Sequence, residues 1–120
     1  MIISKNILIT GASTGIGYDL AKVFVTNGYK VYGSVRKQED AERLSNELGK
    51  NFHSLIFDVT DFKAVETAYE KLNKEIGGEG LAGLVNNAGI AIGGPFMDLS
   101  LDEFKHQFEV NVFGLIKVTQ

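Results

Sequence analysis

Three glycines at the spacing G-x-x-x-G-x-G, Gly11, Gly15 and Gly17, follow directly on the apolar run 7–9 and precede a segment with helical periodicity. Glycine has no Cβ and therefore lets a chain turn sharply from a strand into a helix. The start of that helix presents free backbone N–H groups and the positive end of the helix dipole, which together bind anions. In this setting the natural anion is the pyrophosphate of a dinucleotide, although the better-known pattern is G-x-G-x-x-G. A plain tight turn is the alternative for this loop taken alone.

The elements that must position this loop alternate between strand and helix. Apolar and β-branched runs predict strands at 7–10, 30–35, 52–59 and 81–85. Apolar residues three and four positions apart predict helices at 15–27, 38–48 and 62–76, and a long last helix that starts at the capping box of Ser100 and Glu103. The inward helix faces are expected at Ile16, Leu20, Val23 and Phe24, then at Phe62, Val65, Tyr69, Leu72 and Ile76, and finally at Phe108, Val112 and Leu115.

This alternation predicts the α/β class, with residues 1–120 forming one dinucleotide-binding domain around a doubly wound, Rossmann-type parallel sheet of strand order 3-2-1-4. Ligands of such sheets bind beyond the C-terminal strand ends, where the order reverses between the first and fourth strands. Asp58-Val59 and the segment from Asn86 to Gly89 follow the third and fourth strands. The topology therefore brings both segments to the glycine loop.

Composition narrows the possible functions. Apolar residues make up 44% of the chain, charged residues 22%, and the net charge is −3, which gives no reason to expect nucleic acid or an anionic membrane as a partner. There is no cysteine, and His53 and His106 lack the spacing of metal ligands, so no metal site is expected. No apolar run reaches the roughly 18 residues of a membrane span. The start, Met1-Ile2-Ile3-Ser4-Lys5, lacks the features of a signal peptide, so a cytoplasmic location is expected.

The sequence resembles the short-chain dehydrogenase/reductase family over all 120 residues. Five elements occur in the family's order: the stretch from Thr10 to Gly17, Arg36, Asp58-Val59, the stretch from Asn86 to Gly89, and Asn111. The resemblance implies that the backbone from Gly11 to Gly17, including Gly15 and Ile16, holds the pyrophosphate, with the hydroxyls of Ser13 and Thr14 as extra donors.

The same resemblance assigns roles after the third and fourth strands. It implies that Asp58 binds the exocyclic amine of adenine and that the backbone of Val59 contacts the ring edge, whereas a helix-capping carboxylate is the alternative for Asp58. Asn86, Ala88 and Gly89 would line the riboses. Asn87 either does the same or ties the fourth strand to its neighbours, and the sequence favours neither interpretation.

Arg36 decides the expected cofactor. A carboxylate at the end of the second strand would bind the ribose 2′-hydroxyl and repel a 2′-phosphate. This chain has Arg36 and Lys37 there, and a guanidinium can bind a phosphate through two hydrogen bonds. NADP is therefore favoured over NAD, although many relatives that prefer NADP carry a basic residue where this loop has Thr14. A solvated residue that opens a helix is the alternative for Arg36.

Asn111 interrupts the apolar face of the last helix. In the family this asparagine belongs to a catalytic tetrad and holds a water that relays protons to a catalytic lysine. A polar residue satisfied by a neighbouring carbonyl is the alternative.

The family's catalytic Ser and Tyr-x-x-x-Lys lie beyond this position, and the chain ends before them. Tyr18 and Lys22 have the Tyr-x-x-x-Lys spacing but belong to the pyrophosphate end of the site. The 120 residues are expected to be the N-terminal half of a longer enzyme, because the last apolar stripe still runs at Gln120.

The resemblance implies an NADP(H)-dependent oxidoreductase that transfers hydride between the nicotinamide and a small-molecule carbonyl or secondary alcohol. The loop 90–98, with Phe96 and Met97, is expected to form one wall of a pocket for a lipophilic substrate.

The alternative to an oxidoreductase is a non-catalytic dinucleotide-binding module or an inactive fragment. A methyltransferase with a nucleoside cofactor is a weaker one, against which Arg36 and the segment from Asn86 to Gly89 argue. A homo-oligomer is expected through the helix 62–76 and the helix from Ser100 onward.

Overall fold

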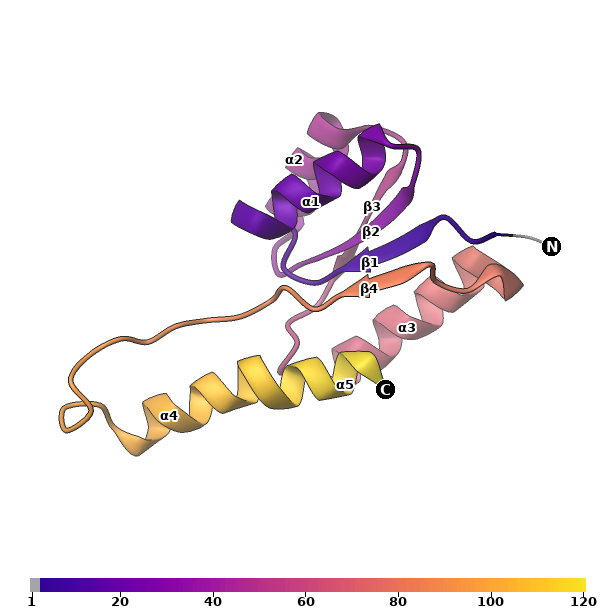
Figure 1. The fold of residues 1–120 in the computed structure, drawn as a ribbon. Helices are drawn as coiled ribbons and strands as arrows, with labels where there is room; N and C mark the ends of the chain where they lie inside the picture. The colour runs from indigo at the N-terminus through magenta and orange to yellow at the C-terminus, as the bar shows by residue number, and fades with distance from the viewer. Residues whose placement is uncertain (1–2) are drawn as a thin grey trace.

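Four parallel strands form one sheet in the order β3-β2-β1-β4 in the computed structural model, which describes residues 3–120 (Figure 1). The strands are β1 (Asn6–Ile9), β2 (Lys30–Val35), β3 (Phe52–Ile56) and β4 (Gly83–Val85). The predicted α/β class and strand order are confirmed. Met1 and Ile2, the first residues of the stretch inspected for a signal peptide, lie outside the described part of the chain.

Helices cover both faces of this sheet (Figure 1). One face carries α1 (Gly15–Thr26) and α2 (Gln38–Leu48), and the other carries α3 (Phe62–Ile76) and α5 (Leu115–Thr119). A 3₁₀ turn, η1 (Gly77–Glu79), follows α3, and α4 (Leu101–Phe108) runs into a π-helical segment, η2 (Glu109–Gly114). None of the helices in residues 3–120 is long and apolar enough to cross a bilayer.

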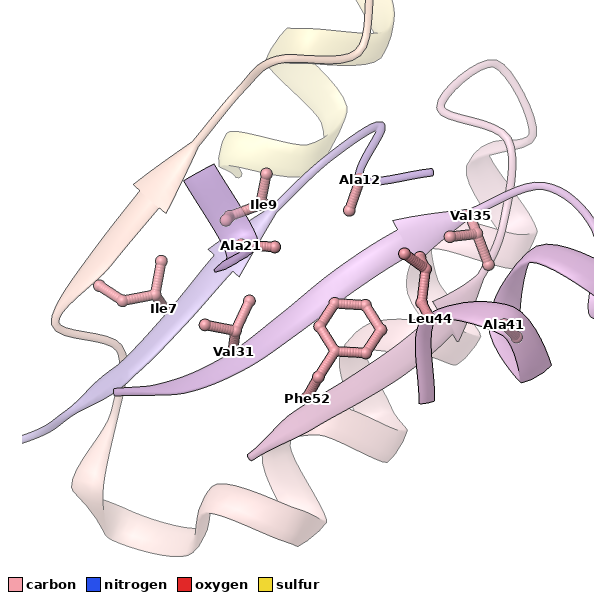
Figure 2. Packing of buried hydrophobic residues seen from close by; sticks show 9 residues of the cluster. All are labelled: Ile7, Ile9, Ala12, Ala21, Val31, Val35, Ala41, Leu44 and Phe52. Atoms are coloured by element: carbon pink, nitrogen blue, oxygen red, sulfur yellow. The ribbon is translucent and has the colours of Figure 1, made fainter. Parts of the chain in front are cut away.

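Two apolar layers hold these helices to the sheet, because alternate residues of each strand point to opposite faces. Figure 2 shows the layer under α1 and α2, in which Val31 and Phe52 from the strands meet Ala21 and Leu44 from the helices. The opposite layer joins Leu8, Tyr32, Leu55 and Phe57 to Val65, Ala68, Leu72 and Val110. A sheet covered on both faces explains why the strands contain consecutive apolar residues.

The inward face of α1 agrees in part with the predicted one. Leu20 and Phe24 pack on the core as predicted, but Ile16 and Val23 are 73% and 56% exposed, and the fully buried positions are the small residues Gly17 and Ala21. Small residues let the helix axis come close to the sheet.

The inward face of α3 also agrees in part. Val65 and Leu72 are buried and Ile76 packs on the core as predicted, together with Ala68, while Phe62 and Tyr69 are exposed.

The last helix also differs from the prediction. It is not one continuous α-helix, since residues Glu109–Gly114 are π-helical, and the predicted inward residues Phe108, Val112 and Leu115 are exposed. Val110 and Gly114 are the buried residues of this segment. Gly114 lies so close to Val59 that a Cβ on it would stand 2.6 Å from Val59 Cγ2. Because Gly114 packs on Val59, the buried face of this helix is the one that carries Val110 and Gly114, not the more hydrophobic face that carries Phe108, Val112 and Leu115.

Strand β3 is shorter than predicted and ends at Ile56. The ladder continues for one bond, because the N–H of Phe57 donates to the carbonyl of Val35. The chain then turns at Asp58, whose carboxylate accepts hydrogen bonds from Thr60. Strand β4 is confined to Gly83–Val85, and the predicted start at Leu81 lies before it.

Candidate dinucleotide-binding site

The glycine loop between β1 and α1 uses glycine conformations that other residues rarely adopt. Gly11 and Gly15 have φ angles of +67° and +58°. Gly11 also lies against the segment that follows β4, where a Cβ would stand 3.0 Å from the Cα of Ala88. The Gly11 N–H donates to Ser34 Oγ at 2.9 Å, so the first half of the loop is attached to both neighbouring strands.

Gly17 has a packing role beneath this loop. A Cβ on Gly17 would overlap the carbonyl oxygen of Gly11 and stand 2.5 Å from Asn87 Nδ2. That Asn87 amide donates to the carbonyls of Thr10 and Gly11, at 3.1 and 3.0 Å. Asn87 therefore ties the end of β4 to the glycine loop, and it also lines the adjacent cavity. The two interpretations of Asn87 left open by the sequence are compatible.

The N-terminus of α1 has no side-chain cap. Thr14 is the N-cap residue, and its side chain accepts no hydrogen bond from the first turn. The first backbone N–H groups of α1 are consequently free to bind an external acceptor. This helix start opens on a cavity of about 350 Å³, a size that small-molecule ligands commonly occupy.

The cavity collects most of the residues that the sequence analysis assigned to the cofactor. It is lined by the predicted residues Gly11, Ser13, Thr14, Ile16, Arg36, Asp58, Val59, Ala88 and Gly89. It is also lined by residues that sequence reasoning missed: Ser34, Val35, Phe57, Ile90, His106 and Val110. The strand ends of β1, β2, β3 and β4 thus meet at one edge of the sheet, as parallel topology requires.

Four predicted residues do not line this cavity. Gly15 is the first residue of α1, with open space where a Cβ would stand, and Gly17 lies buried beneath the loop. Asn86 turns away, and its Nδ2 donates to Thr119 Oγ1 at 3.0 Å. The side chain of Asn111 binds Ile90, as described below.

Asp58 presents a charged carboxylate to the cavity. Burial alone would raise its pKa, but the backbone N–H and hydroxyl of Thr60, with the positive charge of Arg36 nearby, hold the pKa below its ordinary value. Only one oxygen, Oδ1, carries these bonds, at 2.9 Å to the Thr60 nitrogen and 2.8 Å to its hydroxyl. The N-cap of α3 is Asp61, which accepts from the Ala64 N–H, so Asp58 does not cap that helix.

Arg36 is exposed at the cavity rim where β2 ends. None of the ion pairs among residues 3–120 involves its guanidinium. A guanidinium without a carboxylate partner retains its donors for an added anion. Lys37 follows as the exposed N-cap residue of α2.

Asn111 holds the backbone that follows β4. Its Oδ1 accepts from the Ile90 N–H at 2.9 Å, and its Nδ2 donates to the Ile90 carbonyl at 2.8 Å. One turn earlier, Gln107 Oε1 accepts from the Ile92 N–H at 3.1 Å. Two side-chain amides therefore satisfy an extended segment as a neighbouring strand would. The satisfied polar residue anticipated as an alternative is the observed state of the Asn111 side chain.

Two expected features lie away from the cavity. Phe96 packs on Phe104 with ring centroids 5.4 Å apart, and both Phe96 and Met97 are highly exposed, so neither forms a wall of the cavity. Tyr18 does not line it either; the neighbouring Glu47 carboxylate raises the pKa of its hydroxyl. Within residues 3–120 no group of side chains could hold a metal ion, and His53 and His106 remain apart.

The donor set fits a dinucleotide. A loop with glycine at positions 11, 15 and 17 and an uncapped helix start suit a pyrophosphate, and a free guanidinium suits a phosphate ester. The free Oδ2 of Asp58 suits an amine as donor. Residues that could hold such a cofactor are therefore present at one strand edge.

Fold and site together define a Rossmann-type domain with a nucleotide-sized cavity at its topological switch point. The chain belongs to the short-chain dehydrogenase/reductase family, because the family model described as short chain dehydrogenase matches residues 5–120. The resemblance noted from the sequence is confirmed.

Curated relatives with high identity are oxidoreductases. The chain is 44% identical over 113 residues to an NADPH-dependent 3-dehydrocapnine reductase of Ornithobacterium rhinotracheale, covering 94% of this chain and 40% of the relative. It is 41% identical to a serine 3-dehydrogenase of Agrobacterium fabrum, covering 97% of this chain and 46% of the relative. The chain thus spans less than half the length of these two proteins.

Solved structures share the fold, and this chain again spans about half of their length. A 3-ketoacyl-(acyl-carrier-protein) reductase from Brucella melitensis, complexed with NADH, superposes with a TM-score of 0.89 at 32% identity, covering 99% of this chain and 48% of that one. A closed form of serine dehydrogenase complexed with NADP+ superposes with a TM-score of 0.87 at 33% identity, covering 95% of this chain and 46% of that one. These neighbours include complexes with both nicotinamide dinucleotides.

Proposed function

We propose that this chain supplies the dinucleotide-binding half of an NADP(H)-dependent oxidoreductase acting on a small-molecule carbonyl or secondary alcohol. The observation that carries the proposal is the free guanidinium of Arg36 at the rim of a cavity that also contains the uncapped start of α1. An NADPH-dependent reductase among the relatives and an NADP+ complex among the structural neighbours support the choice of cofactor.

In this proposal each part of the cavity holds one part of the cofactor. The backbone from Gly11 to Gly17 holds the pyrophosphate through the N–H groups that follow Ala12, since those of Gly11 and Ala12 are bound to Ser34. The Ser13 and Thr14 hydroxyls are extra donors, and Arg36 binds the 2′-phosphate. The free oxygen of Asp58 accepts from the adenine amine beside the Val59 backbone. Ala88 and Gly89 lie along the riboses, and Asn86, whose side chain is bound to Thr119, contributes there through its backbone. When bound, the nicotinamide would supply or accept the hydride.

Asn111 is the residue of this chain proposed to take part in proton transfer. Its side-chain oxygen and nitrogen each make one bond to Ile90, which leaves a second lone pair and a second hydrogen for a water. The catalytic Ser and Tyr-x-x-x-Lys implied by the family resemblance are not among these 120 residues. Turnover is therefore proposed for a protein that carries those residues as well.

The test is a fluorescence titration of the chain with NADPH and NADH, with Arg36→Asp measured beside the wild type. Loss of a charge-assisted phosphate contact and introduction of a repelling carboxylate should weaken NADPH binding at least tenfold and leave NADH binding equal or tighter. Lys63→Asp, the same charge change on α3 away from the cavity, should alter neither. Equal NADPH and NADH affinity in the wild type would contradict the cofactor assignment.

A dinucleotide-binding module without chemistry is the alternative, and it predicts the same titration. Oxidation of NADPH by carbonyl compounds separates the two, because only the oxidoreductase, assayed in a protein that also carries a Ser and a Tyr-x-x-x-Lys, turns over.

Self-association through α3 and the helices from Ser100 onward is part of the proposal. The outer face of these helices exposes Phe108, Val112, Phe113, Leu115 and Ile116. Sedimentation that reports a monomer at every concentration would contradict it.

A further inference from the structure

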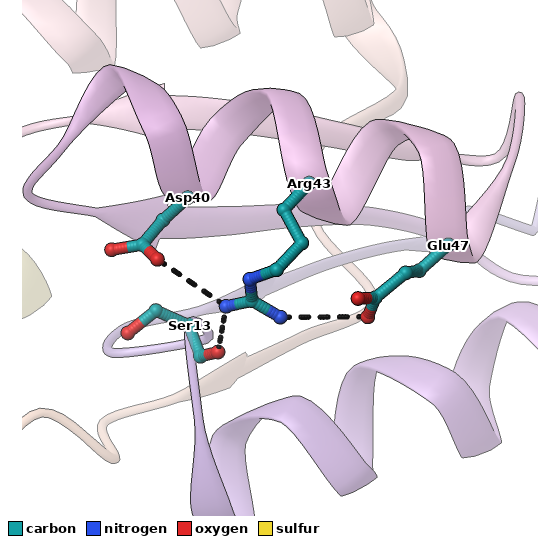
Figure 3. Close-up of polar contacts among 4 residues, drawn as sticks. All are labelled: Ser13, Asp40, Arg43 and Glu47. Carbon is teal, nitrogen blue, oxygen red and sulfur yellow. Dashed lines mark hydrogen bonds and ion pairs between the residues drawn. The ribbon is translucent and has the colours of Figure 1, made fainter.

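The side chain of Arg43 on α2 extends to the glycine loop and contacts Ser13 (Figure 3). Its Nη2 donates to the backbone carbonyl of Ser13 and to Asp40 Oδ1, the latter at 3.3 Å. Its Nη1 lies 3.4 Å from Glu47 Oε2. Asp40 and Glu47 belong to the same helix, three residues before and four after, so they hold the guanidinium from both sides.

This contact attaches the half of the loop that the sheet does not reach. Gly11 and Ala12 donate from their N–H groups to Ser34, and Asn87 binds the carbonyls of Thr10 and Gly11. Among residues 3–120, the hydrogen bond from Arg43 is the one that joins Ser13 to another element. The orientation of Ser13 therefore depends on α2 rather than on β1, β2 or β4.

The peptide bond transmits this constraint to the cavity. In a trans peptide the carbonyl of one residue and the N–H of the next point in opposite directions. With the Ser13 carbonyl directed at α2, the Thr14 N–H is directed away from α2. Ser13 and Thr14 line the cavity and Arg43 does not, so Arg43 acts through the loop rather than on a ligand.

We propose that Arg43 is a positioning residue, which fixes the Ser13–Thr14 peptide so that the Thr14 N–H is ready to bind the pyrophosphate. This inference rests on the proposed function. It separates two arginines that the sequence places seven residues apart: Arg36 selects the 2′-phosphate, whereas Arg43 sets the affinity for any dinucleotide. A donor fixed before binding loses less freedom on binding and so binds more tightly.

The experiment compares three ligands on wild type, Arg43→Met and Arg43→Lys. NADPH and NADH contain the pyrophosphate, and adenosine 2′-monophosphate does not. Arg43→Met should weaken NADPH and NADH binding by the same factor, about tenfold, because the loop must then be ordered on binding. Binding of adenosine 2′-monophosphate should stay unchanged. Arg43→Lys retains a charged donor and should recover part of the loss, and Lys50→Met, which removes a charge just beyond α2, should cause none.

A second readout does not depend on any ligand. In nuclear magnetic relaxation of the free chain, Arg43→Met should lower the order parameter of the Thr14 amide and leave that of Gly11, which is bound to Ser34, unchanged. Unchanged NADH affinity, or equal weakening of adenosine 2′-monophosphate and NADH, would overturn the inference. A wild-type chain that binds none of the three ligands would instead overturn the proposed function. The order parameter of Thr14 would then still show whether Arg43 fixes the loop.

Discussion

Thr10 and Asn87 are joined by reciprocal hydrogen bonds where β1 and β4 end, because the side chain of each one binds the backbone of the other. The Thr10 hydroxyl oxygen accepts from the backbone N–H groups of Asn87 and Ala88, at 3.0 and 2.9 Å. The Asn87 side chain donates in return to the carbonyls of Thr10 and Gly11. These four bonds continue the contact between the two strands beyond the end of their ladder and fix the base from which the glycine loop starts.

Thr10→Val is expected to destabilise the fold by about 1–3 kcal/mol. Valine keeps the shape but leaves the Ala88 N–H without an acceptor, and the Asn87 N–H with the Val85 carbonyl alone, at a position that is 2% exposed. Urea denaturation measures the change. Thr10→Ser retains the hydroxyl and should cost clearly less, and a Thr10→Val midpoint equal to that of the wild type would contradict the role of this clamp.

Gly17→Ala is expected to destabilise the chain by about 3 kcal/mol, because the added methyl has no space beneath the glycine loop. Gly78→Ala is the matched control: nothing lies within 4 Å of its Cβ position and its φ is not positive. Thermal unfolding of the two variants gives the comparison. Similar melting temperatures for both would show that α1 does not pack on the loop as described.

Asp58 should contribute to the pH dependence of stability. Because its pKa in the folded chain lies below the ordinary value of about 3.9, the ionised carboxylate stabilises the fold above that pH. This contribution is lost as the pH falls through the lower, folded-state pKa. Thr60→Val removes the hydroxyl donor and should raise the pKa of Asp58, as followed by carbon-13 titration of its carboxyl group. A wild-type carboxyl that titrates at or above 3.9 would refute the assignment.

Gln107→Leu is expected to accelerate hydrogen exchange of the Ile92 amide about fivefold, since the N–H loses an acceptor whose net contribution is about 1 kcal/mol. The Ile90 amide, which is bound by Asn111, should change less. Gln107→Glu keeps an acceptor oxygen and should retain protection at Ile92. Equal acceleration at both amides would mean that the two side chains do not act separately.

The sequence was sufficient for the strand order and for most of the cavity. Both depend on local signals, namely apolar runs, helical spacing and glycines at a strand end, and parallel topology then fixes where the strand ends meet. Asp58 and Arg36 could be placed for this reason. Ser34 could have been noticed as a polar residue in an apolar strand, two positions before Arg36.

Tertiary contacts explain what the sequence did not reveal. The inward face of α1 was predicted correctly at Leu20 and Phe24 but wrongly at Ile16 and Val23, because hydrophobicity favours these two, whereas close packing selects Gly17 and Ala21. The π-helical segment was missed because the apolar spacing of the last helix is that of an α-helix. No feature of the sequence indicates that Arg43 binds the carbonyl of Ser13, a contact between residues 30 positions apart.

The π-helical segment sets the angle about the helix axis between two groups of contacts. Before it, Gln107 of α4 binds the segment after β4, and after it, Lys117 of α5 lies 2.7 Å from Glu66 of α3. A π turn contains one residue more than an α turn, and each α-helical residue rotates the chain by about 100°. If the segment became α-helical without losing a residue, Lys117 would therefore rotate by about 100° away from Glu66 while Gln107 stayed in place. The extra residue of the π turn is thus what keeps the two groups of contacts aligned.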